Sequence, residues 1–444
     1  MTIEDASMLS YVSTSCLSTH FSGLRYSPDG TCLLTNHVLD NTLHVYEPNS
    51  SKCAKPVITT RFASPVYDYC WFPSMDSTDP STCAYLASAR DQPLQLWDAW
   101  TGAMRASYIA RDDKDELTAA NCCVFSPDGT LIYAGYRNAV RVFRTDMPGL
   151  DCEVRKTVDS RRSKDGQRGI ISCIAPNLDG SLYAVGSYEG SIYLYDERCN
   201  GAVTSLDPGT FTCKGVKINS RKAMKASASS ASDMESIAER AKERWMDRNV
   251  GLGITSLKWG VEGELYSASR RGGAVVSWDI RNMGGVSRRY KRDGDTNQTL
   301  EFDLDPTGRL LLVGDRGGKA RVYDTKTGEE GKGLSSSDVG GDEEIDEWDA
   351  VNGVGFSSIE CNGVTGKLAV VTGERHYGGV PRGRSEQQES DESEDDEDED
   401  EKDKDEEGMD VDEDDSDADD SEDDSDMHRG GKVIVFKFKY SSTT

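Results

Sequence analysis

Long apolar runs and clustered histidines are both missing from this sequence. No run approaches the ~20 apolar residues that a membrane-spanning helix needs, and the N-terminal MTIEDASMLSYVS lacks the basic start and apolar core of a signal peptide. The five His stand singly, and the twelve Cys include no C-x-x-C pair. Metal sites and catalytic groups draw on such clusters. We therefore expect no enzymatic activity, no cofactor, no metal, no small-molecule substrate and no membrane.

Acidic residues are concentrated in one tract. The formal net charge is −28, but residues 386–426 hold 28 of the 79 Asp and Glu and only two of the 51 Lys and Arg. The rest of the chain has 51 acidic and 49 basic residues and is close to neutral. A tract of this composition favours disorder. The net charge therefore does not identify the partner of the folded part, but the placement of its basic residues can.

Internal repeats organise the remainder of the chain. Alternating apolar strands are followed by a turn at Asp29-Gly30, and similar turns recur at Asp128-Gly129, Asp179-Gly180, Glu262-Gly263, Thr307-Gly308 and Gly366. A later strand of most repeats ends in an aromatic residue followed by Asp, as in Trp97-Asp98 and Trp278-Asp279. A period of ~40–45 residues with a WD-like close is typical of propeller blades. The sequence predicts an all-β fold, a seven-bladed WD-repeat β-propeller.

The predicted boundaries divide the chain into four parts. Residues 1–20 hold a strand that closes the ring, 21–376 hold blades one to seven, 377–431 form a long acidic disordered loop in the last blade, and 432–444 return as its final strand. Blade four is followed by an insertion at 207–250, basic and disordered at first and helical later. That helix either packs on the rim of a blade or docks a partner.

Arginine recurs in the hairpin between the second and third strands of a blade. The five positions are Arg90, Arg137, Arg270 with Arg271, Arg316 and Arg375, and Tyr188 occupies the matching turn of blade four. In a propeller these hairpins reach one face, near the mouth of the central channel. The connections between blades open there too, and one carries Arg161, Arg162 and Lys164.

Guanidinium groups gathered on one face suit a polyanion, because arginine binds phosphate and guanine edges in a planar, bidentate manner. Aromatic residues nearby, namely Tyr136, Tyr188, Tyr290 and Trp100, are candidates for stacking on unpaired bases. The alternative is that each arginine pairs locally, as Arg90 would with Asp91. The acidic tract follows Arg375, so it is either a solvated loop or an internal mimic of nucleic acid that masks the basic rim.

Several idiosyncratic strings resemble the telomerase Cajal body protein family, WD-repeat proteins that bind small Cajal-body RNAs. These strings are PVYDYCWF, DQPLQLWDAWTG, DELTAANCCVFSPDGT, RNAVRVFRTDMPGLDCEVR, GQRGIISCIAPN and FDLDPTG. We expect two departures from the family, namely the lack of a long Pro/Ser-rich N-terminal region and the presence of the 207–250 insertion. The resemblance implies a nuclear protein of the nucleoplasm or Cajal body that binds the Cajal-body box of small nuclear RNAs.

The function expected from both arguments is a non-catalytic RNA-binding scaffold. The resemblance implies H/ACA-class small nuclear RNA or telomerase RNA as partner, together with ribonucleoprotein proteins, in RNP localisation and assembly and in telomere maintenance or RNA modification. The RNA-binding residues expected from the hairpin argument are Arg90, Arg137, Arg161, Arg162, Lys164, Tyr188, Arg270, Arg271, Arg316 and Arg375. The alternative is a protein-only adaptor for splicing factors or histones, in which the same rim binds an acidic peptide.

Overall fold

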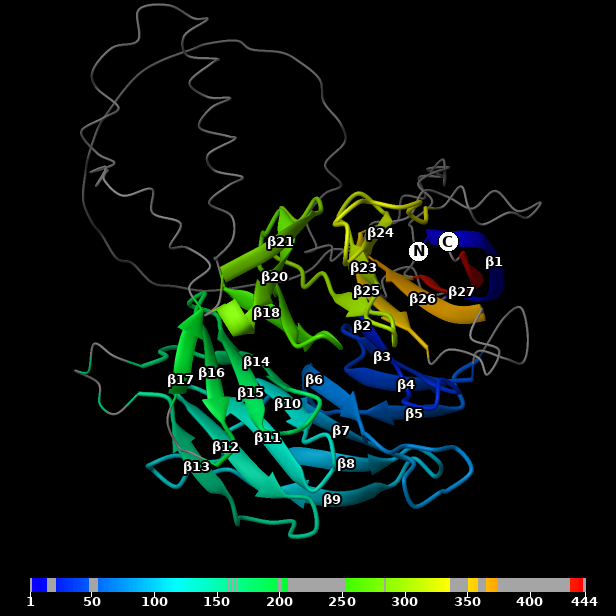
Figure 1. Cartoon of the computed structure of the whole chain (residues 1–444). Coiled ribbons are helices and arrows are strands. Elements are labelled where there is room, and N and C mark those ends of the chain that lie inside the picture. The colour runs from blue at the N-terminus through cyan, green and yellow to red at the C-terminus, as the bar shows by residue number, and fades with distance from the viewer. Residues whose placement is uncertain are drawn as a thin grey trace, which may run out of the picture. The chain divides into compact units, whose positions relative to one another are not determined.

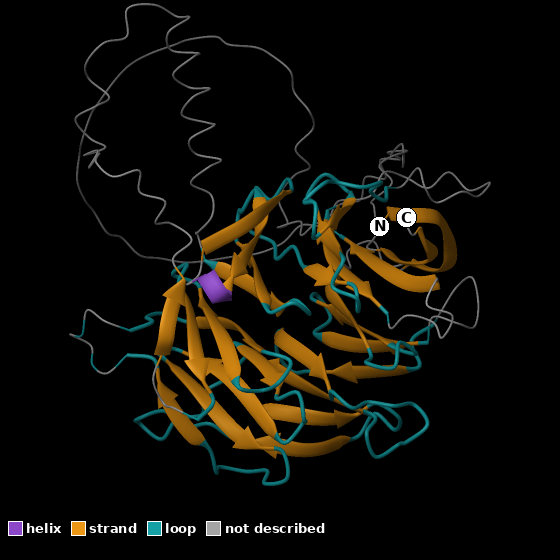
Figure 2. Ribbon diagram, viewed as in Figure 1, coloured by secondary structure: helices purple, strands orange, loops and turns teal. Residues whose placement is uncertain are grey.

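Seven antiparallel sheets form the blades of a β-propeller ring, which confirms the predicted fold class (Figure 1). The computed structural model describes residues 2–13, 21–47, 55–158, 160, 163, 166–198, 202–206, 253–282, 285–335, 350–357, 365–373 and 432–441. Within these ranges the secondary structure is strand apart from one 3-10 turn at Ile280–Asn282 (Figure 2). No helix in the described ranges is long and apolar enough to span a membrane. The insertion at 207–250 and the acidic loop lie outside the described residues.

Strands follow chain order within each of the first five blades. Blade one contains β2 (Phe21–Tyr26), β3 (Leu33–His37), β4 (Thr42–Tyr46) and β5 (Ile58–Arg61). Blade two contains β6 (Val66–Trp71), β7 (Ala84–Ala89), β8 (Leu94–Asp98) and β9 (Met104–Tyr108). Blade three contains β10 (Cys122–Phe125), β11 (Leu131–Tyr136), β12 (Ala139–Arg144) and β13 (Glu153–Lys156). Blade four contains β14 (Ile171–Pro176), β15 (Leu182–Ser187), β16 (Ile192–Asp196) and β17 (Ala202–Leu206). Blade five contains β18 (Ile254–Trp259), β19 (Glu264–Ser269), β20 (Ala274–Asp279) and β21 (Gly285–Lys291).

The last two blades depart from this simple pattern. Blade six has three regular strands, β22 (Phe302–Leu304), β23 (Leu310–Gly314) and β24 (Ala320–Asp324), and single bridges join β24 to Glu330 and Leu334. Blade seven has the order β25 (Val351–Phe356), β26 (Thr365–Thr372), β27 (Lys432–Ser441) and β1 (Thr2–Ser13). The two ends of the chain therefore pair in one sheet, which covers the edge of β27 that an open ring would expose.

Glycine in the turn after the first strand of a blade has a backbone reason. Gly129 has a φ of +73°, and its counterparts at positions 30, 180, 263 and 308 are also left-handed. Side-chain-bearing residues rarely adopt this conformation, so the Asp-Gly pattern correctly marked these turns. Gly366 does not fit the pattern, because it lies inside β26, where it pairs with Phe438, so the predicted turn there was wrong.

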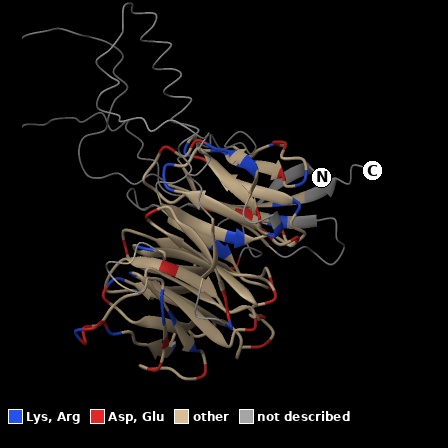
Figure 3. Ribbon diagram, turned by 60° about the vertical axis from the view of Figure 1, so that its left-hand side comes forward, with Lys and Arg blue, Asp and Glu red and all other residues tan. Residues whose placement is uncertain are grey.

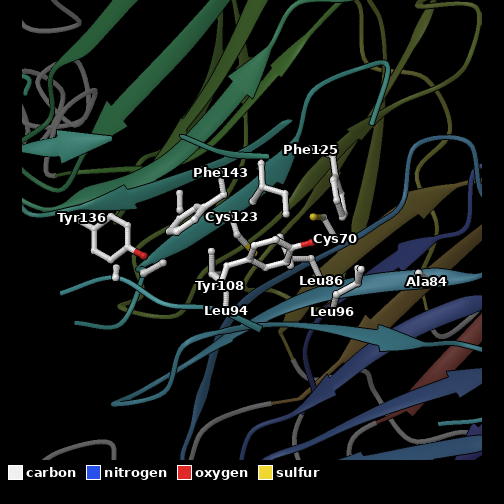
Figure 4. Packing of buried hydrophobic residues seen from close by; sticks show 14 residues of the cluster. Cys70, Ala84, Leu86, Leu94, Leu96, Tyr108, Cys123, Phe125, Tyr136 and Phe143 are labelled. Carbon is white, nitrogen blue, oxygen red and sulfur yellow. The ribbon is translucent and has the colours of Figure 1, made fainter. Parts of the chain in front are cut away.

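The core lies between neighbouring blades. Figure 4 shows the cluster shared by blades two and three, where Tyr108 and Phe143 pack with ring centroids 5.8 Å apart. The Tyr108 hydroxyl donates to the Thr145 carbonyl (2.7 Å), so this buried polar atom is satisfied. Cys70 and Cys123 are buried in the same cluster, where a thiol packs as a small apolar group.

Candidate nucleic-acid interface

The hairpins between second and third strands lie where the first strands of the blades begin. Each is tied by its backbone to a segment that precedes a first strand. The hydrogen bonds run from Arg90 N–H to Pro65 (3.0 Å), Tyr188 N–H to Ile170 (3.0 Å), Arg270 N–H to Gly253 (2.8 Å) and Arg316 N–H to Asp293 (2.9 Å). Arg137 forms an antiparallel bridge with Ile170, at the entry to the next blade. The predicted residues that the structure describes therefore share one edge of the ring.

Tyr188 and Arg270 form a stacked pair across blades four and five. The guanidinium carbon of Arg270 lies 4.9 Å from the centroid of the Tyr188 ring, and 41% of Tyr188 is exposed. Partial burial raises the pKa of the Tyr188 phenol, although Arg270 opposes this shift. The hydroxyl is thus a donor at neutral pH, and the cation–π contact holds both side chains in place. An aromatic face backed by a cation is suited to stacking on an unpaired base.

A buried arginine fixes the hairpin that carries Arg270. Arg292 donates from Nε to the Gly272 carbonyl (3.1 Å), from Nη2 to Ser269 (3.1 Å) and from Nη1 to Leu300 (2.8 Å). Burial lowers the pKa of Arg292 to about 10, with Asp315 opposing, so the group is still charged at neutral pH. Three carbonyl oxygens thus take the place of the water molecules that would solvate the Arg292 guanidinium, and these hydrogen bonds hold the hairpin against blade six.

Arg271 and Arg316 are anchored to the same connection between blades five and six. Arg271 Nε donates to Asn297 Oδ1 (3.0 Å), and Arg316 Nη1 donates to the Asp295 carbonyl (3.0 Å). Both side chains are exposed. Arg270 and Arg271 belong to the same hairpin. The guanidinium groups of Arg270, Arg271 and Arg316 and the ring of Tyr188 therefore form one contiguous arc over blades four to six, which we call the Arg–Tyr arc.

Arg90 and Arg137 lie on the same edge but outside this arc. Arg90 donates from Nε to the Tyr67 hydroxyl (3.3 Å), a hydrogen bond that raises the pKa of Arg90, and Arg137 is exposed. Among the described residues, no carboxylate lies within ion-pair distance of Arg90, Arg137 or any arginine of the arc. The local pairing of Arg90 with Asp91 that the sequence left open is therefore not found there.

Other predicted features change in the structure. Tyr136 (4% exposed) and Tyr290 (0%) are core residues, so they cannot stack on a ligand base. Trp100 is 61% exposed but lies in the turn after the third strand of its blade, at the opposite edge. The burial of Tyr136 and Tyr290 was missed because the sequence does not show which face of a strand packs on the next blade.

The basic rim is also less continuous than expected. Asp112, Asp113, Asp115 and Glu116 lie on the connection into blade three, and Figure 3 shows residues of both signs interspersed over the propeller. Arg161, Arg162, Lys164 and Arg375 lie outside the described residues. The basic cluster that the structure brings together is therefore the Arg–Tyr arc.

A network of charged groups lines the central channel, and sequence reasoning missed it. Arg25 on β2 pairs with Asp68 on β6 (3.0 Å), and Lys258 on β18 pairs with Asp303 on β22 (2.6 Å). Each acid also accepts a backbone N–H from the next blade, Asp68 from Cys123 (2.9 Å) and Asp303 from Phe356 (2.9 Å). These contacts join the first strands of successive blades and give the network a structural role. No group of three His, Cys, Asp or Glu in the described ranges is placed to hold a metal ion.

The fold and its repeat define a class. Residues 159–196 match the family model "WD domain, G-beta repeat", so the chain is a WD-repeat β-propeller protein, and no enzymatic family is indicated. Telomerase Cajal body protein 1 of Bos taurus is 36% identical over 325 residues, which cover 71% of this chain and 51% of that protein. The Homo sapiens protein is 36% identical over 324 residues, covering 70% of this chain and 50% of that protein. The resemblance to the telomerase Cajal body protein family is thereby confirmed for the propeller.

A more distant relative carries a different name. Guanine nucleotide-binding protein negative regulator 1 of Schizosaccharomyces pombe is 29% identical over 314 residues, which cover 67% of this chain and 69% of that protein. The chain spans about half the length of the Cajal body relatives that it matches. The nuclear, Cajal-body localisation predicted from the sequence agrees with the names of those relatives.

Proposed function

We propose that this propeller is a nuclear, non-catalytic scaffold that binds a Cajal-body-box motif in small nuclear RNA of the H/ACA class or in telomerase RNA. The proposal includes a role in localising and assembling the ribonucleoprotein, which serves telomere maintenance or RNA modification. The relatives named telomerase Cajal body protein support the telomerase and Cajal-body setting, and the Arg–Tyr arc supports an RNA partner and the place where it binds.

The observation that carries the proposal is the Arg–Tyr arc itself. Exposed arginines contact phosphates and set affinity, whereas an aromatic face stacks on a splayed base and favours single strands. Tyr188 backed by Arg270, with Arg271 and Arg316 beside it, supplies both kinds of contact within one surface. Arg90 and Arg137 on the same edge extend the path for a longer strand, as would Arg161, Arg162, Lys164 and Arg375.

A salt titration with RNA tests this proposal. We expect the full chain to bind a hairpin with an unpaired Cajal-body box more tightly than one with a scrambled box, with affinity falling as salt rises. Each removed phosphate contact should flatten the log–log slope by about 0.7. Arg271→Gln and Arg316→Gln should each do so, whereas Tyr188→Ala should weaken binding of both unpaired sequences and reduce the preference for unpaired over duplex RNA.

Arg281→Gln is the matched control. Arg281 is an exposed arginine of the same blade, but it follows the third strand, at the opposite edge, where it pairs with Asp279 (3.5 Å). Equal losses from Arg281→Gln and Arg271→Gln would refute the Arg–Tyr arc as the interface.

A protein-only adaptor is the second candidate, favoured by the name of the fission yeast relative. In that case the same edge should bind an acidic peptide of a splicing factor or histone partner in preference to RNA. Competition between a poly-glutamate peptide and the box RNA separates the two functions.

A further inference from the structure

A pocket opens between blades five and six at the edge opposite the Arg–Tyr arc. Its volume is about 250 Å³. The walls come from the turns after the first strands of both blades, from β19 and β21, and from the turn after β24. The side chains that line it include Val261, Glu262, Glu264, Tyr266, Arg288 and Lys326. The structural network and the RNA edge use none of these side chains.

Arg288 is placed on the pocket wall by strand register. Tyr266, Ser277 and Arg288 are cross-strand partners on β19, β20 and β21, so their side chains share one face of the sheet. The next residue, Arg289, projects to the other face. The Arg288 side chain lies along the turn at Gly328, where a Cβ would come within 3.1 Å of Arg288 Cδ. No carboxylate of the described residues pairs with the Arg288 guanidinium.

The acidic groups of the pocket already have partners. Glu264 Oε2 accepts a hydrogen bond from the Tyr266 hydroxyl (3.0 Å), and its Oε1 accepts one from Ser287 (3.5 Å). Burial raises the pKa of the Tyr266 phenol, which keeps this hydroxyl protonated as a donor. Glu262 pairs with Lys326 across the blade boundary (3.2 Å), but both side chains are more than half exposed, at 67% and 57%. Such an exposed pair is weak, so Lys326 can exchange its partner for a ligand.

An apolar contact borders these cations. Val261 is 56% exposed at the pocket mouth. It lies against Gly308, whose φ is +70° and whose added Cβ would come within 3.0 Å of the valine side chain. The pocket thus offers a free guanidinium, an exchangeable ammonium and an open aliphatic surface within the volume of one or two side chains.

We propose that this pocket binds a peptide segment of a protein partner through an Asp or Glu side chain next to an aliphatic residue. The ligand carboxylate accepts from Arg288 and Lys326, and the aliphatic side chain covers Val261. A charge-assisted pair of this kind is stronger than a neutral hydrogen bond. Because the pocket and the arc lie at opposite edges of the ring, the peptide does not compete with RNA, and this proposal does not depend on the proposed RNA function.

An array of short peptides tests the proposal on the full chain. The probe is a set of hexapeptides with blocked ends, built from Leu, Val, Ser and one variable position that is Asp, Glu, Asn, Gln, Lys or Arg. We expect selection of Asp or Glu beside Leu or Val, and a loss of about tenfold or more in affinity with Arg288→Gln, since one charged hydrogen-bond partner is removed. Arg289→Gln is the matched control and should bind as the unaltered chain does.

Three outcomes would overturn the proposal. One is selection of Lys or Arg, which would make Glu262 and Glu264 the ligands instead. Another is equal binding by the Arg288→Gln and Arg289→Gln proteins, and the third is an absence of selection at the variable position. Val261→Ser is a second variant that leaves the charges intact, and it should weaken binding of the Leu-containing peptides.

Discussion

Glu301 should make the stability of the propeller fall as the pH rises through neutrality. It immediately precedes β22, and its Oε2 accepts the backbone N–H of Leu24 on β2 (3.4 Å). Gly23 leaves room for this approach, since a Cβ there would lie 2.9 Å from Glu301 Oε1. Burial in the channel raises the pKa of Glu301 to about 7, and it outweighs the opposing effects of Arg25 and Lys258.

The sign and size of the effect follow from proton linkage. The ordinary pKa of glutamate is 4.5, so between that value and about 7 the folded chain holds a proton that the unfolded chain has released. The free energy of unfolding therefore decreases as the pH rises across this window. The linkage relation gives a loss of about 2 kcal/mol between about pH 5.5 and about pH 8.5, an upper value because the side chain is only partly buried.

Substitution by glutamine isolates this contribution. Glu301→Gln keeps an acceptor for Leu24 but cannot ionise, so it mimics the protonated carboxyl. Between about pH 5.5 and about pH 8.5, the free energy of unfolding of the unaltered chain, measured by urea denaturation, should fall by about 2 kcal/mol relative to that of the variant. Glu329→Gln, at an exposed carboxylate after β24, is the control and should track the unaltered chain. Parallel pH profiles for the Glu301→Gln protein and the unaltered chain would refute the reasoning.

Three further changes test how the ring is held. Asp68→Ala removes both the partner of Arg25 and the acceptor of Cys123 N–H, so the free energy of unfolding should drop by about 3 kcal/mol in urea; no change would contradict the structural role of the channel network. Gly129→Ala places a side chain on a residue whose φ is +73°, with its Cβ 2.7 Å from the Phe72 ring. The free energy of unfolding should fall by about 2 kcal/mol, and the melting temperature by several degrees. Deleting β1 exposes the edge of β27, so the truncated chain should self-associate or melt at a lower temperature. A peptide of the β1 sequence added in trans should reverse this effect. An unchanged melting temperature would show that β1 does not close the ring.

The blade architecture could be predicted because its signals are local. A left-handed turn favours glycine, and a strand that packs on one face alternates, so Asp-Gly pairs and WD-like closes repeat at the blade period. Gly366 shows the limit of this logic, since a glycine inside β26 has the same sequence context as one in a turn. The hairpin positions of Arg90, Arg270 and Arg316 followed from the same repeat, because topology assigns every such hairpin to one edge.

Contacts between distant segments could not be predicted in this way. The Arg25–Asp68 pair joins two blades, and Glu301 reaches Leu24 from a position 277 residues away in the chain. The local strand pattern of each segment is satisfied without the other, so no periodicity reveals these contacts. The same limit explains why Tyr290 was considered a stacking residue although it is buried in the core between blades five and six.

Strand β21 connects the two proposed sites and allows their independence to be predicted. Arg288 lies in the pocket, and Arg292, one residue past the end of the strand, holds the Arg270 hairpin, a separation of about 13 Å at the usual rise of a strand. Between them, Tyr290 and Lys291 pair with β20, and the Tyr290 hydroxyl donates to the Thr325 carbonyl of blade six (3.2 Å).

The ladder with β20 holds one edge of β21, and the Tyr290 hydroxyl ties the strand to blade six, so we expect no coupling between its ends. Saturating acidic peptide should leave the RNA affinity within about twofold, which corresponds to a coupling free energy below about 0.4 kcal/mol. A change of tenfold or more that Arg288→Gln abolishes would mean that β21 or the Arg270 hairpin has two arrangements, and that Arg292 exchanges its carbonyl partners between them.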